Sequence, residues 1–123
     1  MRKTPVYVSF DYDHDKVLKE FVIGQSKLED SPFEVIDHSI KETVNGDWVS
    51  EAEKRIKRSE VVLVLVGSDS HRAQGVLKEV ALARKNEKKI VQVIGYKDAD
   101  PKAVPNAGRL YRWSWDNMKS ILK

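Results

Sequence analysis

The chain has 123 residues, of which 41% are hydrophobic and 33% are charged, an ordinary balance for one globular domain with its own core. Its net charge of +3 is small and its basic residues are interleaved with acids, so we expect no nucleic-acid partner. The absence of cysteine excludes disulfides, thiolate nucleophiles and cysteine-based metal sites. The sequence shows neither a signal-peptide core nor an apolar run near the ~20 residues that span a bilayer. We therefore expect a cytoplasmic protein with no membrane partner.

The amino-terminal half alternates strand and helix patterns. Residues 5–10 alternate in polarity and are rich in β-branched and aromatic types, which predicts a strand. Residues 15–23 repeat apolar side chains at helical spacing and precede Gly24, a typical helix stop. Residues 33–37 predict a short second strand before a loop at 38–46. The apolar positions of the first helix are Val17, Leu18, Phe21 and Val22.

The carboxyl-terminal half continues the alternation. Six consecutive apolar residues at 61–66 predict a strand buried on both faces, as in the centre of a parallel sheet. The whole pattern predicts a doubly wound α/β sheet of four or five parallel strands with helices on both faces, in one domain over 1–123. We expect further helices at 47–58, 72–86 and 114–122, the last capped by Ser114, and strands at 89–95 and 110–113. The helix positions expected to face the sheet are Trp48, Ala52, Ile56, Val76, Val80, Ala81 and Ala83.

Common ligand-binding signatures are absent from the sequence. Parallel sheets bind small ligands beyond the carboxyl ends of their strands, so the polar residues after Val66 are candidates for a site. The chain has no glycine-rich dinucleotide or phosphate loop and no Gly-x-Ser-x-Gly elbow. His14, His38 and His71 lack the spacing of metal ligands, so we expect no metal site.

A phosphoacceptor function is one alternative, because receiver domains share this architecture. Acidic residues Asp11 and Asp13 follow the first strand, Asp69 follows the central strand and Lys97 follows a later one. However, Asp69 lies three residues beyond the strand end, in a Gly-Ser turn, which fits a phosphoacceptor poorly. Fold alone does not confer that function.

Four segments, taken in order, resemble TIR domains. Residues 6–15 resemble the opening strand and its acidic loop, and residues 31–42 resemble the second strand and the long loop after it. Trp48 and residues 55–59 match the next helix, and residues 75–80 match the helix that carries the active-site glutamate of the family. The similarity is closest to the bacterial and archaeal TIR-like group that includes the signal-generating subunit of the Thoeris antiphage defence system.

The resemblance implies a flavodoxin-like fold and an enzyme that acts on NAD as its substrate, with no separate cofactor. Catalytic TIR domains cleave the bond between nicotinamide and ribose, and they release ADP-ribose or cyclise it into a signalling nucleotide. In the Thoeris group the cyclic product activates an effector, so a partner would be reached through a diffusible product.

The residue that the resemblance places in the catalytic role is Glu79. Nicotinamide leaves NAD as a neutral ring, so the reaction needs a carboxylate near the ribose more than it needs a general acid. The alternative is that Glu79 is a solvated helix residue paired with Lys78 or Arg84, as most helix glutamates are exposed.

Other residues are candidates for substrate binding. Phe10 would stack on the base or the nicotinamide, or else pack in the core, and Asp11 would bind ribose or begin a loop. Ser39 and Ile40 lie in the loop that closes the family's site or contacts a neighbouring subunit. The turn after the central strand adds two candidates for phosphate or ribose. The substrate-binding candidates are Phe10, Asp11, Ser39, Ile40, Ser68 and His71.

Two further points qualify the enzymatic expectation. Many catalytic TIR domains carry a bulky residue four positions before the glutamate, where this chain has Gly75. Many TIR domains also act only by assembling with one another. In that alternative, the loop at 38–46 and the basic helix end formed by Arg55, Lys57 and Arg58 would be the working surface for self-association.

Overall fold

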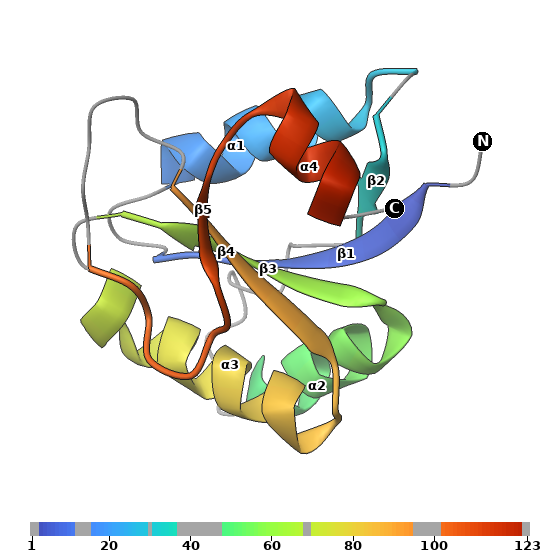
Figure 1. Cartoon of the computed structure of the whole chain (residues 1–123). Helices are drawn as coiled ribbons and strands as arrows, with labels where there is room; N and C mark the ends of the chain where they lie inside the picture. Colours follow the sequence, from blue (N-terminus) through green and yellow to red (C-terminus); the bar gives the residue numbers. More distant parts are fainter. Residues whose placement is uncertain are drawn as a thin grey trace.

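The structure is one five-stranded parallel sheet, whose strand order is β2-β1-β3-β4-β5 (Figure 1). This arrangement confirms the predicted doubly wound, flavodoxin-like α/β class. The strands are β1 (Thr4–Ser9), β2 (Phe33–Val35), β3 (Val61–Val66), β4 (Lys89–Ile94) and β5 (Leu110–Arg112). The computed structural model describes residues 3–11, 16–29, 31–36, 48–67, 70–94 and 102–121.

Two layers of helices sandwich the sheet. Helices α1 (Lys16–Ser26) and α4 (Trp115–Ile121) lie on one face, and α2 (Trp48–Arg58) and α3 (Gln74–Lys85) lie on the other (Figure 1). A 3₁₀ turn, η2 (Ser70–Arg72), precedes α3. None of the helices in the described ranges combines the length and the apolar character that a bilayer crossing requires.

Strand β3 is the centre of both cores, as its continuous apolar sequence predicts. It pairs with β1 on one side and β4 on the other, and all six of its residues are buried. Successive side chains of a strand point to opposite faces. Leu63 and Leu65 therefore pack under α1 and α4, whereas Val62 and Val64 pack under α2 and α3. Each such buried side chain contributes roughly 1.5–3 kcal/mol of transfer free energy.

In helix α1, the apolar spacing of the sequence does not identify which side chains are buried. Helix α1 buries Leu18 and Val22, one turn apart, but Val17 is 73% exposed and Phe21 is also exposed. The apolar spacing predicted the helix but not which of these side chains are buried, because only one narrow stripe of α1 contacts the sheet. Gly24 does not end the helix, which continues to Ser26.

Two smaller expectations have opposite outcomes. Ala81 is exposed, contrary to its predicted place on the buried face of α3. Ser114 does cap α4, because its Oγ accepts a hydrogen bond from the backbone N–H of Asn117 at 3.0 Å.

Candidate functional site

Glu79 lies on the buried face of α3 and is 0% exposed. It shares this face with Val76, Val80 and Ala83, which are spaced at three and four residues and pack toward the sheet. The alternative that Glu79 is a solvated surface residue is therefore wrong. A carboxylate in this position costs several kcal/mol of desolvation unless neighbouring groups compensate it.

Two hydroxyl groups of β1 compensate the Glu79 carboxylate. The Tyr7 hydroxyl donates a hydrogen bond to Oε2 of Glu79, and the Ser9 hydroxyl donates to Oε1 at 2.8 Å. Tyr7 and Ser9 are two residues apart on β1, so both side chains point to the α3 face of the sheet. The two oxygens of one carboxylate are thus held from one strand at its carboxyl-terminal half, the end at which parallel sheets bind ligands.

The environment of Tyr7 keeps its phenol in the protonated, donating form. Burial raises the pKa of Tyr7 well above its usual range, and the charge of Glu79 and the hydrogen bond to it raise this pKa further. The nearby Arg55 guanidinium acts in the opposite direction but is outweighed. Tyr7 therefore serves as a permanent hydrogen-bond donor to Glu79 across the physiological pH range.

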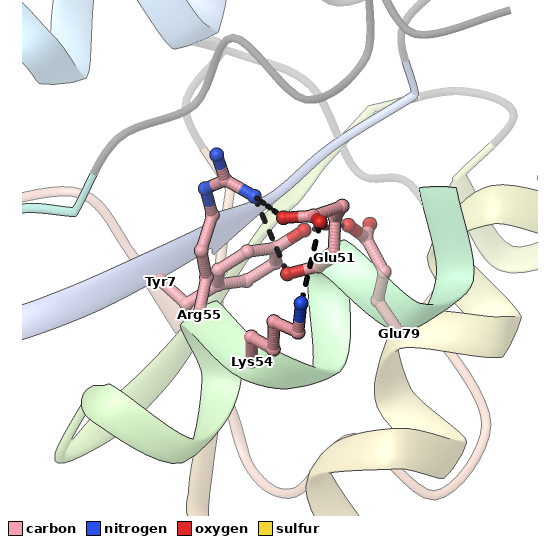
Figure 2. Close-up of polar contacts among 5 residues, drawn as sticks. All are labelled: Tyr7, Glu51, Lys54, Arg55 and Glu79. Atoms are coloured by element: carbon pink, nitrogen blue, oxygen red, sulfur yellow. Dashed lines mark hydrogen bonds and ion pairs between the residues drawn. The ribbon is translucent and has the colours of Figure 1, made fainter. Parts of the chain in front are cut away.

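Arg55 brings positive charge from α2 toward this pair (Figure 2). Its Nη1 lies 3.2 Å from Oε2 of Glu51, one helical turn earlier, and 3.4 Å from the Glu51 carbonyl oxygen. Lys54 lies 3.5 Å from the other carboxylate oxygen of Glu51. Glu51 thus anchors Arg55 along the helix, and the side chain of Arg55 is mostly buried.

Of the six residues predicted to bind substrate, the structure describes three. Phe10 is 1% exposed and packs in the core on the α1 side, with Lys19 Nζ 5.6 Å from the centre of its ring. It therefore makes the packing contact that the sequence also allowed, on the sheet face opposite to Glu79. Asp11 is buried two residues after the end of β1. The predictions for Ser39, Ile40 and Ser68 fall outside the described residues.

His71 is the third described candidate. It lies in the η2 turn between β3 and α3, and its side chain is half-buried. Within the described part of the chain its Nδ1 atom is buried and has no hydrogen-bond partner. His71 remains a candidate contact at the carboxyl end of β3.

Tyr7 and Ser9 were not identified from the sequence as site residues. Their signal was their spacing, because polar groups at positions 7 and 9 share one face of a strand whose interior is otherwise apolar. The prediction that no metal binds is not tested by the structure. Among the described residues, no three histidine, aspartate or glutamate side chains converge on one point.

A surface hollow lies elsewhere, at the amino-terminal end of β4. Its volume is about 370 Å³. It is formed by the end of α3, the start of β4 and the segment before β5, so it does not include the Tyr7–Glu79 pair. The lining residues are Arg84, Glu87, Lys88, Ile90, Asn106 and Gly108.

Both the sequence and the fold of this chain are similar to those of known proteins. The sequence matches the family described as "Thoeris protein ThsB, TIR-like domain" over residues 7–100. A solved structure titled "Crystal Structure of a prokaryotic SEFIR domain" is similar in fold, with a TM-score of 0.59 and 20% identity over 96% of this chain and 86% of that chain. No curated protein matches the chain. Because the family match covers well over half of its length, the chain belongs to the family of TIR-like domains of the Thoeris protein ThsB.

Proposed function

We propose that this TIR-like domain cleaves the nicotinamide–ribose bond of NAD, with Glu79 as the catalytic carboxylate, and that it makes a cyclic ADP-ribose-type signal in antiphage defence. The observation that carries the proposal is one fully buried glutamate on an otherwise apolar helix face, held by two hydroxyls. Buried ionisable groups with specific partners cluster at functional sites, because a purely structural position is filled at lower cost by an apolar side chain.

The chemistry of the bond matches a single carboxylate. Cleavage transfers the bonding electrons to the nicotinamide ring, which departs neutral, and positive charge develops on the ribose. A carboxylate beside the ribose stabilises that oxocarbenium-like transition state. Water then adds to the ribose carbon that carried the nicotinamide and loses a proton, which gives ADP-ribose. Alternatively, another nucleophilic atom of the same molecule adds to this carbon and closes a ring. Glu79 is the fully buried carboxylate among the described residues, and the hydrogen bonds from Tyr7 and Ser9 hold it in one place.

The burial of Glu79 restricts the access of NAD to its carboxylate. Because Glu79 is 0% exposed, NAD reaches its carboxylate only after the groups that cover it move. This state of the domain is therefore a closed one, and its basal turnover is expected to be slow. Gating of this kind is common in enzymes whose site assembles on activation.

The direct test is nicotinamide release from NAD at high protein concentration, followed by chromatography. Glu79→Gln keeps the side-chain volume but removes the charge, and the expected loss is about 100-fold or more, as for other preorganised charge-stabilising groups. The matched control is Glu20→Gln, the same change at an exposed position of α1 on the opposite face of the sheet. Chromatography of the same samples separates linear from cyclic ADP-ribose.

Two results would contradict the proposal. Equal turnover in the wild type and in Glu79→Gln would remove Glu79 from the mechanism. Assembly seen by light scattering, with no nicotinamide release at any concentration, would instead support the interaction-module alternative. That alternative relies mainly on the loop at 38–46, which lies outside the described residues.

A further inference from the structure

We propose that Tyr7 is a positioning residue, whose hydroxyl fixes the orientation of the Glu79 carboxylate so that it can stabilise the positive charge that develops on the ribose of the substrate. This inference rests on the proposed function, which it deepens. Tyr7 does not contact the reacting atoms itself and acts through Glu79.

Two hydrogen bonds fix the plane of the Glu79 carboxylate. Tyr7 and Ser9 donate to different oxygens of the same carboxylate. One hydrogen bond leaves a carboxylate able to rotate about the bond to its methylene carbon, whereas two bonds to different oxygens fix its plane. Both donors come from the part of β1 that pairs with the central strand β3, at Val62 and Val64, so they stand on a rigid support.

The Tyr7 ring packs in the core in a way that does not require its hydroxyl. Tyr7 is 2% exposed and belongs to the core between the sheet and helices α2 and α3. A phenylalanine would fill the same space, so the hydroxyl is not needed for packing. Within the described part of the chain, the hydrogen bond that this hydroxyl donates goes to Glu79. The hydroxyl therefore has one identifiable task, which is to hold the carboxylate.

The charged side chains near the Tyr7–Glu79 pair come from α2. Arg55, with its partners Glu51 and Lys54, approaches the pair from α2 (Figure 2). The Ser9 hydroxyl approaches the pair from β1. Arg55 is tied to Glu51 at 3.2 Å. Both hydroxyl donors therefore hold Glu79 from β1, while the cation on α2 is anchored by its own helix neighbour.

The test compares Tyr7→Phe with the wild type in two ways. In the nicotinamide-release assay, kcat is expected to fall about 10- to 100-fold, as for small misplacements of a catalytic group, while KM stays within about twofold. Independently of activity, carbon-13 relaxation of the Glu79 side chain, assigned with Glu79→Gln, is expected to show increased motion in Tyr7→Phe. The control is Tyr111→Phe, which deletes the same hydroxyl from β5, where the ring packs beside Arg109.

Each other outcome overturns the inference. Unchanged kcat in Tyr7→Phe, or a lower kcat with unchanged motion of Glu79, would show that Tyr7 does not position the carboxylate. A raised KM would place Tyr7 on the substrate, and a raised kcat would mean that the bond restrains Glu79. If the wild type releases no nicotinamide, the proposed function fails, and the relaxation measurement alone still decides whether Tyr7 fixes Glu79.

Discussion

The contact between Tyr7 and Glu79 makes a quantitative prediction for folding stability that does not depend on catalysis. Tyr7→Phe removes a hydroxyl from a fully packed ring and leaves its volume unchanged. A hydrogen bond to a charged group contributes about 1.5–3 kcal/mol, whereas one between neutral groups contributes about 0.5–1.5 kcal/mol. Tyr7→Phe is therefore expected to cost about 2 kcal/mol in the wild type and about 1 kcal/mol in the Glu79→Gln background.

The difference between these two costs is a coupling free energy of about 1 kcal/mol, measured by a double-mutant cycle. Urea unfolding of the wild type, both single variants and the double variant gives the four stabilities. With a slope of about 2 kcal/mol per molar urea, Tyr7→Phe alone should lower the midpoint by about 1 M. A second cycle that pairs Tyr111→Phe with Glu79→Gln is the control and should be additive. Additivity of the first cycle within about 0.3 kcal/mol would refute the hydrogen bond as the source of coupling.

Three further predictions concern the Tyr7 phenol, the Gln92 amide and the backbone at Gly108. Because the folded-state pKa of Tyr7 lies above its ordinary value near 10, its contribution to stability is complete below pH 10 and is lost as the pH rises further. Tyr7→Phe should flatten the alkaline decline of unfolding free energy by about 1.4 kcal/mol per pH unit above pH 10, and an unchanged slope would contradict the burial of the phenol. Gln92 accepts from the Val104 N–H at 2.7 Å and donates to the Val104 and Gly108 carbonyls, so Gln92→Leu should lower thermal stability by about 2–5 kcal/mol in calorimetry. Gly108 has φ of +82°, and an added Cβ would meet the Ile90 carbonyl oxygen at 2.5 Å. Gly108→Ala should therefore cost about 1–3 kcal/mol in urea unfolding, and a neutral effect would contradict this backbone geometry.

The elements that could be predicted from the sequence are those with one strong local signal. Strand β3 spans 61–66 as predicted, because six consecutive apolar residues fit only a position buried on both faces. The cap of α4 at Ser114 was likewise predictable, because a side-chain oxygen at that position satisfies a backbone N–H within three residues.

The face of a helix was harder to predict where apolar residues are more numerous than the contacts available. Helix α1 has four apolar side chains at helical spacing, but the sheet contacts only the stripe that includes Leu18 and Val22. Phe21 instead meets Trp113 edge-on, with ring centres 5.3 Å apart. That contact joins α1 to the segment after β5, and no local pattern predicts a pairing over such a sequence distance.

Part of the candidate site could be identified from the sequence, and part could not. The resemblance identified its helix and its glutamate, but the sequence also allowed Glu79 to be a solvated helix residue. Only the structure shows that Glu79 shares the buried face of α3 with Val76, Val80 and Ala83. Its partners on β1 lie 72 and 70 residues away along the chain. They meet Glu79 only because β1 and β3 pair in parallel and α3 folds back over them.

The order of apolar and polar residues thus determined the strands, the helices and the class of fold, because burial of period-two and period-3.6 patterns is a local requirement. The tertiary structure alone decided that Glu79 is enclosed and bonded to two hydroxyls, since that depends on strand order and on which helix covers which face. Desolvation and hydrogen bonding act over a few ångströms in space, irrespective of distance along the chain.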